Sequence, residues 1–379
     1  MSEINATRTN IMAAVQMRRQ VVTLPVTWMA VSGALFFAFP SQALTFNLTY
    51  DASTVGAPAG FFTAFQAAIN FYQSAYSDPI TINLQVGWGK INGQNLSPGN
   101  LGQSSTFQWG NLNYDQIVTA LVNDATSADD ATAVASLPAV DPTGGATFVM
   151  ANAEAKALGL MPANATGLDG YVGFSSTAAF TFDTTNRAVA GKYDFIGLAC
   201  HEITEIMGRY GLGQNGASSG RYSPIDLFRY SSPGNLDLVP ANGAYLSIDG
   251  GNVVINTFNG TGGGDLSDWA GQTIDAFNHN ISLGQKMNVS AGDMAEMDVI
   301  GYDLAIGSPS LRISSTGPNS VVLTWSSPVS GFALQTNADL TTANWQPANY
   351  TISTANGTNY STTIDPLPEG NLFFRLLHR

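Results

Sequence analysis

The chain has 379 residues, of which 44 % are hydrophobic and only 11 % are charged. It carries 14 Lys and Arg against 27 Asp and Glu, which gives a formal net charge of −13, and it has no run of basic residues. This balance excludes nucleic acid and anionic membrane surfaces as partners, because both are bound through basic patches. The length is enough for two domains of ordinary size.

The first 43 residues have the pattern of an export signal. Two arginines in residues 17–20 precede an apolar run at 21–39, and a small-residue cleavage site ends at Ala43. We therefore expect a signal peptide over residues 1–43, with Met17 as the true start, and a secreted bacterial protein with no stable membrane insertion. A retained membrane anchor is the alternative, since a run of about 19 apolar residues nearly spans a bilayer.

Strand and helix patterns follow one another over residues 44–306. Alternating apolar residues predict strands at 44–50, 79–88, 146–150, 170–174 and 178–183. Apolar residues at helical spacing predict helices at 59–76, 114–123, 129–136, 151–160 and 291–302. Residues 91–110 are rich in Gly, Asn and Ser, which predicts a polar loop, and 170–183 is expected to form two strands or a hairpin. The order strand, long helix, strand indicates an α+β domain with helices packed on a mixed sheet.

Residues 307–379 have a different pattern. A short Gly- and Pro-containing linker at 307–309 is followed by short alternating segments at 320–325, 332–336, 360–364 and 372–377. Such segments with turn residues between them predict a small all-β sandwich, resembling a fibronectin type III domain. The segment has no cluster of catalytic residue types, so we expect binding or spacing from it rather than chemistry.

The most informative stretch is 193–209, which predicts a buried helix that ends at Gly208. His201 and Glu205 are four residues apart and therefore lie on one helix face. Glu202 is next to His201, so the stretch follows the zinc-metalloprotease pattern HExxH with a glutamate in place of the second histidine. Cys200, the one cysteine, excludes an internal disulfide and is expected to be a small buried residue behind this face.

Several motifs together resemble a family of secreted bacterial metzincin-like metalloproteases of the zincin class. The resemblance rests on 201–209, 224–230, 247–251 and 297–302 and spans about residues 44–304. In relatives with a full HExxH helix, distantly similar to leishmanolysin, the third metal ligand is the histidine of a His-Trp pair. Here the matching pair is Asp268-Trp269. The resemblance therefore implies Zn²⁺ held by His201, Glu205 and Asp268, with Glu202 as the general base.

The third ligand has two rivals. Asp226 is one, and its structural alternative is an ion pair with Arg229; His279 is the other, and its alternative is a solvated loop residue. The position of the third ligand in compact metzincins corresponds to Gly211, which has no side chain to offer. The methionine that such enzymes place beneath the metal corresponds to Phe277.

The expected function is hydrolysis of peptide bonds in a protein or peptide substrate. Two carboxylates and one imidazole form a harder donor set than three histidines, so Mn²⁺ and Fe²⁺ are alternatives to Zn²⁺. A strand near 178–183 is a candidate for binding extended substrate. One rival is an inactive extracellular scaffold. Another is a polysaccharide- or surface-binding protein that uses Trp325 and Trp345 of the C-terminal segment, although such tryptophans more often belong to a core.

Overall fold

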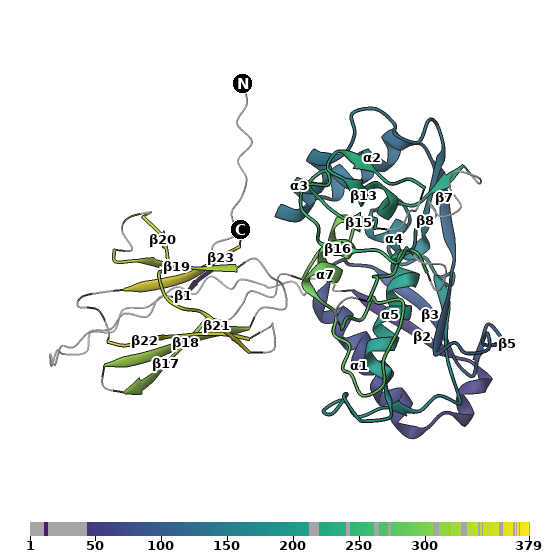
Figure 1. Cartoon of the computed structure of the whole chain (residues 1–379), viewed down its shortest axis with the longest axis horizontal. Coiled ribbons are helices and arrows are strands. Elements are labelled where there is room, and N and C mark those ends of the chain that lie inside the picture. The colour runs from purple at the N-terminus through teal and green to yellow at the C-terminus, as the bar shows by residue number, and fades with distance from the viewer. Residues whose placement is uncertain are drawn as a thin grey trace, which may run out of the picture. The chain divides into compact units, whose positions relative to one another are not determined.

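The computed structural model describes residues 11–13 and 44–378, apart from positions 212–219, 240–242, 261–264, 272–273, 306–310, 318, 327–331, 340–341, 343, 356–358, 367, 369 and 371. The chain divides into two compact units (Figure 1). One spans Ser41–Ala305, and the other contains Ile306–Arg379 together with Met1–Pro40. The predicted signal peptide lies almost wholly outside the described residues.

The larger unit is built on a four-stranded sheet in the order β2-β3-β9-β6. Strands β2 (Thr45–Tyr50), β3 (Thr81–Trp88) and β9 (Gly170–Phe174) are parallel, and β6 (Gly102–Thr106) runs antiparallel to β9. Helix α1 (Ala59–Ala75) connects β2 to β3, as a parallel pair requires. This strand, helix and strand are the ones that the sequence predicts.

Helix α5 (Phe195–Met207) packs against α1, β9 and β6. Aromatic rings fill the space between them: Phe195 lies 4.9 Å from Phe174 and 5.2 Å from Phe61 between ring centroids. All three side chains are fully buried, and each such burial stabilises the fold by about 1.5–3 kcal/mol. Gly208 ends the helix with a φ of 117°, a left-handed conformation that favours glycine, as the sequence predicts.

The remaining elements of this unit form smaller sheets and helices around the core. Its other α-helices are α2 (Tyr114–Asp124), α3 (Ala128–Ser136), α4 (Asn152–Ala157) and α7 (Ala291–Val299), and its 3-10 helices are η1 (Ala52–Gly56) and η2 (Pro224–Phe228). Its other strands are β4 (Lys90–Ile91), β5 (Gln94–Asn95), β7 (Gln108–Leu112), β8 (Thr147–Ala151), β10 (Phe180–Thr181), β11 (Tyr193–Asp194), β12 (Arg221–Tyr222), β13 (Arg229–Ser232), β14 (Asn235–Leu236), β15 (Tyr245–Leu246) and β16 (Asn256–Thr257). The described residues thus form a mixed α and β structure with six α-helices and several small sheets, in agreement with the α+β class.

One prediction for this unit is wrong, and one alternative of another is ruled out. The expected polar loop at 91–110 contains parts of four strands, including β6 and β7, because small polar side chains form strands where they face polar partners. Of the two alternatives for 170–183, two separate strands are confirmed, and the hairpin is not formed. Strand β9 pairs with β3 and β6, whereas β10 pairs in parallel with β11.

The described residues of the smaller unit form two four-stranded antiparallel sheets. One contains β17 (Arg312–Gly317), β18 (Ser320–Ser326), β22 (Asn359–Ile364) and β21 (Ser353–Ala355). The other contains β1 (Ile11–Ala13), β23 (Phe373–His378), β19 (Phe332–Asn337) and β20 (Gln346–Pro347). Inward-facing residues of both sheets share one core, which includes Trp325 at 3 % exposure and Phe374 at 6 %.

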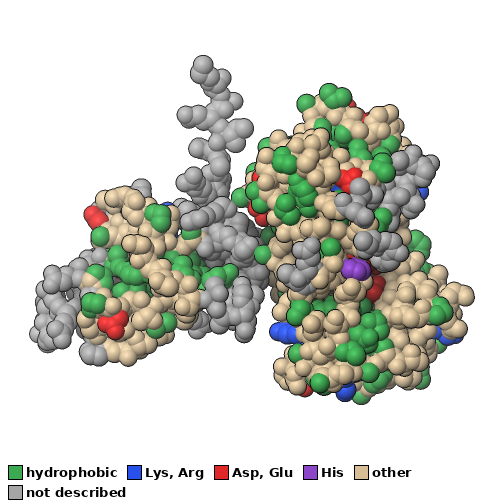
Figure 2. Space-filling model, viewed as in Figure 1, with side chains coloured by type: hydrophobic (Ala, Val, Ile, Leu, Met, Phe, Trp, Pro, Cys, Tyr) green, Lys and Arg blue, Asp and Glu red, His purple; other side chains and the backbone are tan. Residues whose placement is uncertain are grey.

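Charged side chains are sparse on the face that Figure 2 presents, as the low charge content predicts. In the part of the chain that the structure describes, no helix has the length and apolar character needed to span a bilayer.

Candidate metal centre

Helix α5 places two potential ligands on one face. His201 and Glu205 are separated by one helical turn, and His201 Nε2 lies 3.3 Å from Glu205 Oε1. His201 is only 9 % exposed, so its ring is held among the packed elements rather than in solvent.

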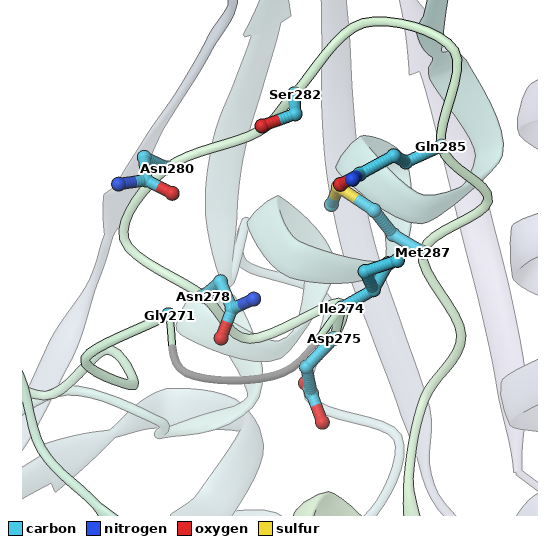
Figure 3. Close-up of a pocket in the computed structure, with 8 residues that line it drawn as sticks. All are labelled: Gly271, Ile274, Asp275, Asn278, Asn280, Ser282, Gln285 and Met287. Atoms are coloured by element: carbon cyan, nitrogen blue, oxygen red, sulfur yellow. The ribbon is translucent and has the colours of Figure 1, made fainter.

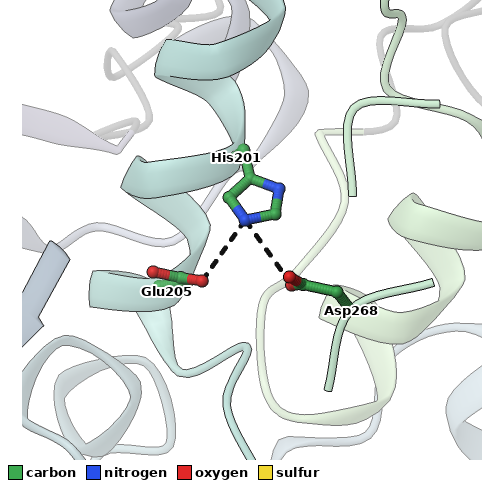
Figure 4. Close-up of side chains that lie close together, drawn as sticks. All are labelled: His201, Glu205 and Asp268. Atoms are coloured by element: carbon green, nitrogen blue, oxygen red, sulfur yellow. Dashed lines mark ion pairs between the residues drawn. The ribbon is translucent and has the colours of Figure 1, made fainter. Parts of the chain in front are cut away.

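Asp268 meets this pair from a different part of the chain (Figure 4). Its Oδ1 lies 3.5 Å from His201 Nε2, and the donor atoms of His201, Glu205 and Asp268 all lie within 4.8 Å of one another. Two donors about 2.1 Å from a tetrahedral Zn²⁺ are about 3.4 Å apart. The two distances from His201 therefore suit a tetrahedral metal.

The turn before Asp268 is fixed by hydrogen bonds that come from three directions. Ser267 donates its N–H and its hydroxyl to Asp265 Oδ1 at 2.8 and 2.7 Å. The N–H of Gly211 donates to Ser267 Oγ at 2.7 Å, and Arg229 Nη2 donates to the carbonyl of Leu266 at 2.8 Å. Asp268 is consequently held at 3 % exposure with its carboxylate directed at the α5 face.

The other ring nitrogen of His201 also has a partner. Nδ1 lies 2.9 Å from the carbonyl oxygen of Ala276, which can only accept a hydrogen bond, so Nδ1 carries a proton. This pairing orients the ring and leaves Nε2 as the nitrogen that faces both carboxylates. Ligating histidines in metal sites are held in the same way.

Arg209, just beyond the end of α5, brings a fully buried cation to the cluster. Its Nη1 donates to Asp268 Oδ1 at 2.6 Å, and its Nη2 lies 3.6 Å from Glu205 Oε1. Its Nε donates to Thr204 Oγ1 at 2.9 Å, and its guanidinium lies 4.4 Å from the centre of the Phe277 ring. Arg209 therefore offsets part of the negative charge of the two carboxylates.

The charges of the cluster shift its titration. Burial alone would lower the pKa of His201, but the Asp268 and Glu205 carboxylates outweigh it and raise the pKa to about 9. Burial alone would raise the pKa of Glu205, but His201 and Arg209 lower it to about 2. At neutral pH the metal-free cluster is thus balanced by two cations, and a metal ion has to displace a proton from His201.

Glu202 lies next to the cluster without belonging to the set of three. It is 5 % exposed, and burial, followed by the neighbouring Glu205 charge, raises its pKa well above the usual value. A divalent cation beside it would favour the ionised form again. A carboxylate in this position suits the transfer of protons more than structural pairing.

Neither rival of Asp268 reaches this cluster. Asp226 Oδ2 accepts the N–H and the hydroxyl of Ser223 at 2.8 and 3.0 Å, which caps η2. His279 Nδ1 lies 3.0 Å from the carbonyl of Trp269, and its Nε2 lies 3.0 Å from Asn280 Nδ2. Phe277, the residue at the methionine position, is fully buried beside Arg209.

A polar cavity of about 320 Å³ lies along the segment that supports His201 (Figure 3). Asp275 and Asn278 line it on either side of Ala276, whose carbonyl is the partner of His201. Met287 also lines it, and its carbonyl lies 2.8 Å from the position of a Cβ on Gly197, one turn before His201 on α5. The cavity therefore borders the segment that supports His201, while none of His201, Glu205 and Asp268 lines it.

Strand β6 supplies two contacts that the sequence did not predict. Ser104 Oγ donates to Glu205 Oε2 at 2.5 Å, and Thr106 Oγ1 donates to the backbone carbonyl of Glu205 at 2.9 Å. No signal in the sequence singles out these residues, because they stand in a segment of small polar residues. The contacts of Arg209 with the cluster were not predicted either, although Arg209 directly follows Gly208, the residue that ends α5.

The cluster thus has three convergent donor groups, a buried carboxylate beside them and an arginine in contact with Asp268 Oδ1 and near Glu205 Oε1, the oxygens that face His201. Compared with protein-family models, with curated proteins and with solved structures, the chain has no match in any of the three.

Proposed function

We propose that the chain is a secreted metal-dependent endopeptidase with a zincin-like, metzincin-like catalytic unit. One observation carries the proposal: the donor atoms of His201, Glu205 and Asp268 converge within 4.8 Å, and Glu202 adjoins them on the same helix. Zincin chemistry requires two ligands on one helix, a third from elsewhere and a carboxylate base. Secretion is proposed from the export pattern of residues 17–43, and the C-terminal unit is interpreted as a small β-sandwich of the fibronectin type III kind.

The donor set favours Zn²⁺, with Mn²⁺ and Fe²⁺ as alternatives, because two of its three members are carboxylates. Two carboxylates neutralise a divalent cation and so weaken its pull on a bound water. Arg209 counters this effect, since its guanidinium withdraws negative charge from Asp268 and Glu205. The site is therefore less anionic than its ligand residues alone suggest.

Each residue then has a role in peptide hydrolysis. A divalent cation, when bound, polarises the scissile carbonyl and makes water a stronger acid. His201, Glu205 and Asp268 hold the cation, while the Ala276 carbonyl fixes the tautomer of His201. Glu202 accepts a proton from the attacking water and passes it to the leaving amine.

The outer edge of β6 is proposed to bind extended substrate. Ser175 N donates to Leu101 O, and Phe107 N donates to Asp169 O. In this antiparallel register, the backbone N–H and C=O groups that bond to β9 therefore belong to the odd-numbered residues of β6. The backbone groups of Gly102, Ser104 and Thr106 therefore point away from β9, where no described strand pairs with them. A peptide can add there as a further strand. The segment 178–183 suits this role less, because its two-residue strand β10 pairs with β11.

The cavity lined by Asp275, Asn278 and Met287 is proposed to receive a side chain of the same peptide. Its lining is mainly polar, and the segment that forms it also supports His201.

An inactive scaffold remains the rival function, and one observation favours it. Arg209 and protonated His201 balance the carboxylates of Glu205 and Asp268 without a metal ion, so the cluster can serve as a buried ion-pair network. The proposed polysaccharide platform has less support, because Trp325 is in the core and Trp345 stacks against Arg375 at 4.5 Å.

Metal content and metal-dependent proteolysis separate the two functions. The purified protein is expected to contain about one equivalent of a transition metal and to cleave denatured casein. A strong chelator should stop cleavage, and Zn²⁺, Mn²⁺ or Fe²⁺ should restore it. A folded protein that takes up none of these metals and cleaves nothing when they are added would contradict the endopeptidase and favour the scaffold.

A further inference from the structure

Strand β6 faces the candidate metal centre with alternate side chains. Side chains along a strand alternate between the two faces of a sheet, so residues 102, 104 and 106 share one face. The contacts of Ser104 and Thr106 with Glu205 show that this face is the one toward α5. Ser105, between them, is exposed and belongs to the opposite face.

Ser104 determines which oxygen of Glu205 is available. Its hydroxyl donates to Oε2, whereas Oε1 is the oxygen that lies 3.3 Å from His201 Nε2. With Oε2 engaged, the carboxylate is held in one rotamer and offers a single oxygen to the position between His201 and Asp268. A ligating carboxylate with a hydrogen bond to its other oxygen is better oriented than a free one.

Gly102 determines where the carboxylate of Glu202 lies. A Cβ on residue 102 would be 2.3 Å from Glu202 Oε1 and 2.9 Å from its Cδ. Non-bonded heavy atoms pack at about 3.5–4.0 Å, so this space accommodates either a side chain at 102 or the carboxylate, but not both. Glycine at this position therefore lets Glu202 approach the strand.

We propose that β6 is the positioning strand of this centre, an inference that rests on the proposed function. Gly102 sets the place of the base Glu202, and Ser104 sets the ligating oxygen of Glu205. The same three residues expose their backbone groups on the outer edge of β6, where we place the substrate. One short strand thus aligns the peptide, the base and a metal ligand with each other.

Two adjacent serines provide the first test. Ser104→Ala in the full chain should weaken the affinity for Zn²⁺ about 10- to 100-fold, since loss of a hydrogen bond to a ligand has effects of this size. Ser105→Ala, one residue away on the opposite face, should leave the affinity unchanged. Competition with a chromophoric chelator measures both, and the visible spectrum of the Co²⁺-loaded protein should shift for Ser104→Ala alone.

The outcomes of this test are distinct. Equal affinities and equal Co²⁺ spectra for the two serine variants would overturn the role of Ser104 while leaving the proposed enzyme intact. If the wild-type protein binds neither Zn²⁺ nor Co²⁺, the proposed metal centre is wrong, and so is the positioning role of β6. Circular dichroism and thermal unfolding establish that both variants are folded.

Gly102→Ala provides the second test. The added methyl group should displace the carboxylate of Glu202 and lower kcat about 100-fold, the cost of a misplacement near 1 Å. KM and the affinity for Zn²⁺ should stay near the wild-type values, because Glu202 is not a ligand. Gly56→Ala is the matched control, since a Cβ on Gly56 has no atom within 4 Å. Unchanged kcat in a folded, metal-loaded Gly102→Ala protein would overturn the role of Gly102.

Discussion

Glutamine in place of Glu202 is expected to stop peptide hydrolysis while the protein stays folded and keeps its metal. The substitution preserves the shape of the side chain but removes its ability to take a proton, and loss of a general base lowers rates by about 10²- to 10⁴-fold. Folding should be little affected, because burial already favours the uncharged form of Glu202. Casein cleavage, metal content and thermal unfolding of Glu202→Gln measure the three effects.

Glu154→Gln is a suitable control for this experiment. Glu154 is also a fully buried glutamate whose pKa burial raises, but it caps α4 through the N–H of Ala151 and has no part in the cluster. Its variant should retain cleavage. Full activity in Glu202→Gln would show that another group is the base, whereas loss of the metal in this variant would show that Glu202 is itself a ligand.

Helix α5 could be predicted from the sequence because its determinants are local. Apolar spacing places one face of 195–207 in the core, and the left-handed residue at its end has to be a glycine. The same spacing fixes the geometry of His201 and Glu205, since residues four apart always share a helix face. These features depend on neighbours in the chain and on nothing further away.

Strand β6 could not be predicted in the same way. Its residues are Gly, Gln, Ser, Ser and Thr, which carry no hydrophobic alternation, because the face toward α5 meets the polar groups of Glu202 and Glu205. The choice between two strands and a hairpin at 170–183 stayed open for a related reason. The neighbours of β9, which are β3 and β6, lie far from it in sequence, and local patterns do not identify the partner of a strand.

The sequence could have ruled out only one of the three candidates for the third ligand, Asp268, Asp226 and His279. Ser223 and Asp226 are three residues apart, the spacing of a capping box, and this signal could have assigned Asp226 to the cap of η2. No local sequence pattern distinguishes Asp268 from His279 as the third ligand. Whether either side chain reaches α5 depends on contacts with residues that are distant in the sequence. Hydrogen bonds from Gly211 and Arg229, both distant in sequence, hold the Asp268 turn.

Methionine in place of Arg209 is expected to cause the largest loss of stability of any single change at the centre. Arg209 is fully buried and pairs with Asp268 at 2.6 Å while it donates to Thr204 and to the His201 carbonyl. Removal of one member of a buried ion pair costs about 3–5 kcal/mol, because the remaining carboxylate is left buried without its counter-charge. Urea unfolding of the metal-free protein measures this loss, and Arg221→Met, at an exposed arginine, should stay within about 0.5 kcal/mol of the wild type.

The metal-loaded protein should respond differently to the same substitution. A divalent cation at the cluster neutralises Glu205 and Asp268 directly, so less of their charge is left uncompensated when Arg209 is gone. Zn²⁺ should therefore recover part of the stability that Arg209→Met loses, in addition to the gain that binding gives the wild type. If Zn²⁺ stabilised neither protein, Arg209 and protonated His201 would be the counter-charges that these carboxylates use, which is the arrangement that the scaffold function requires.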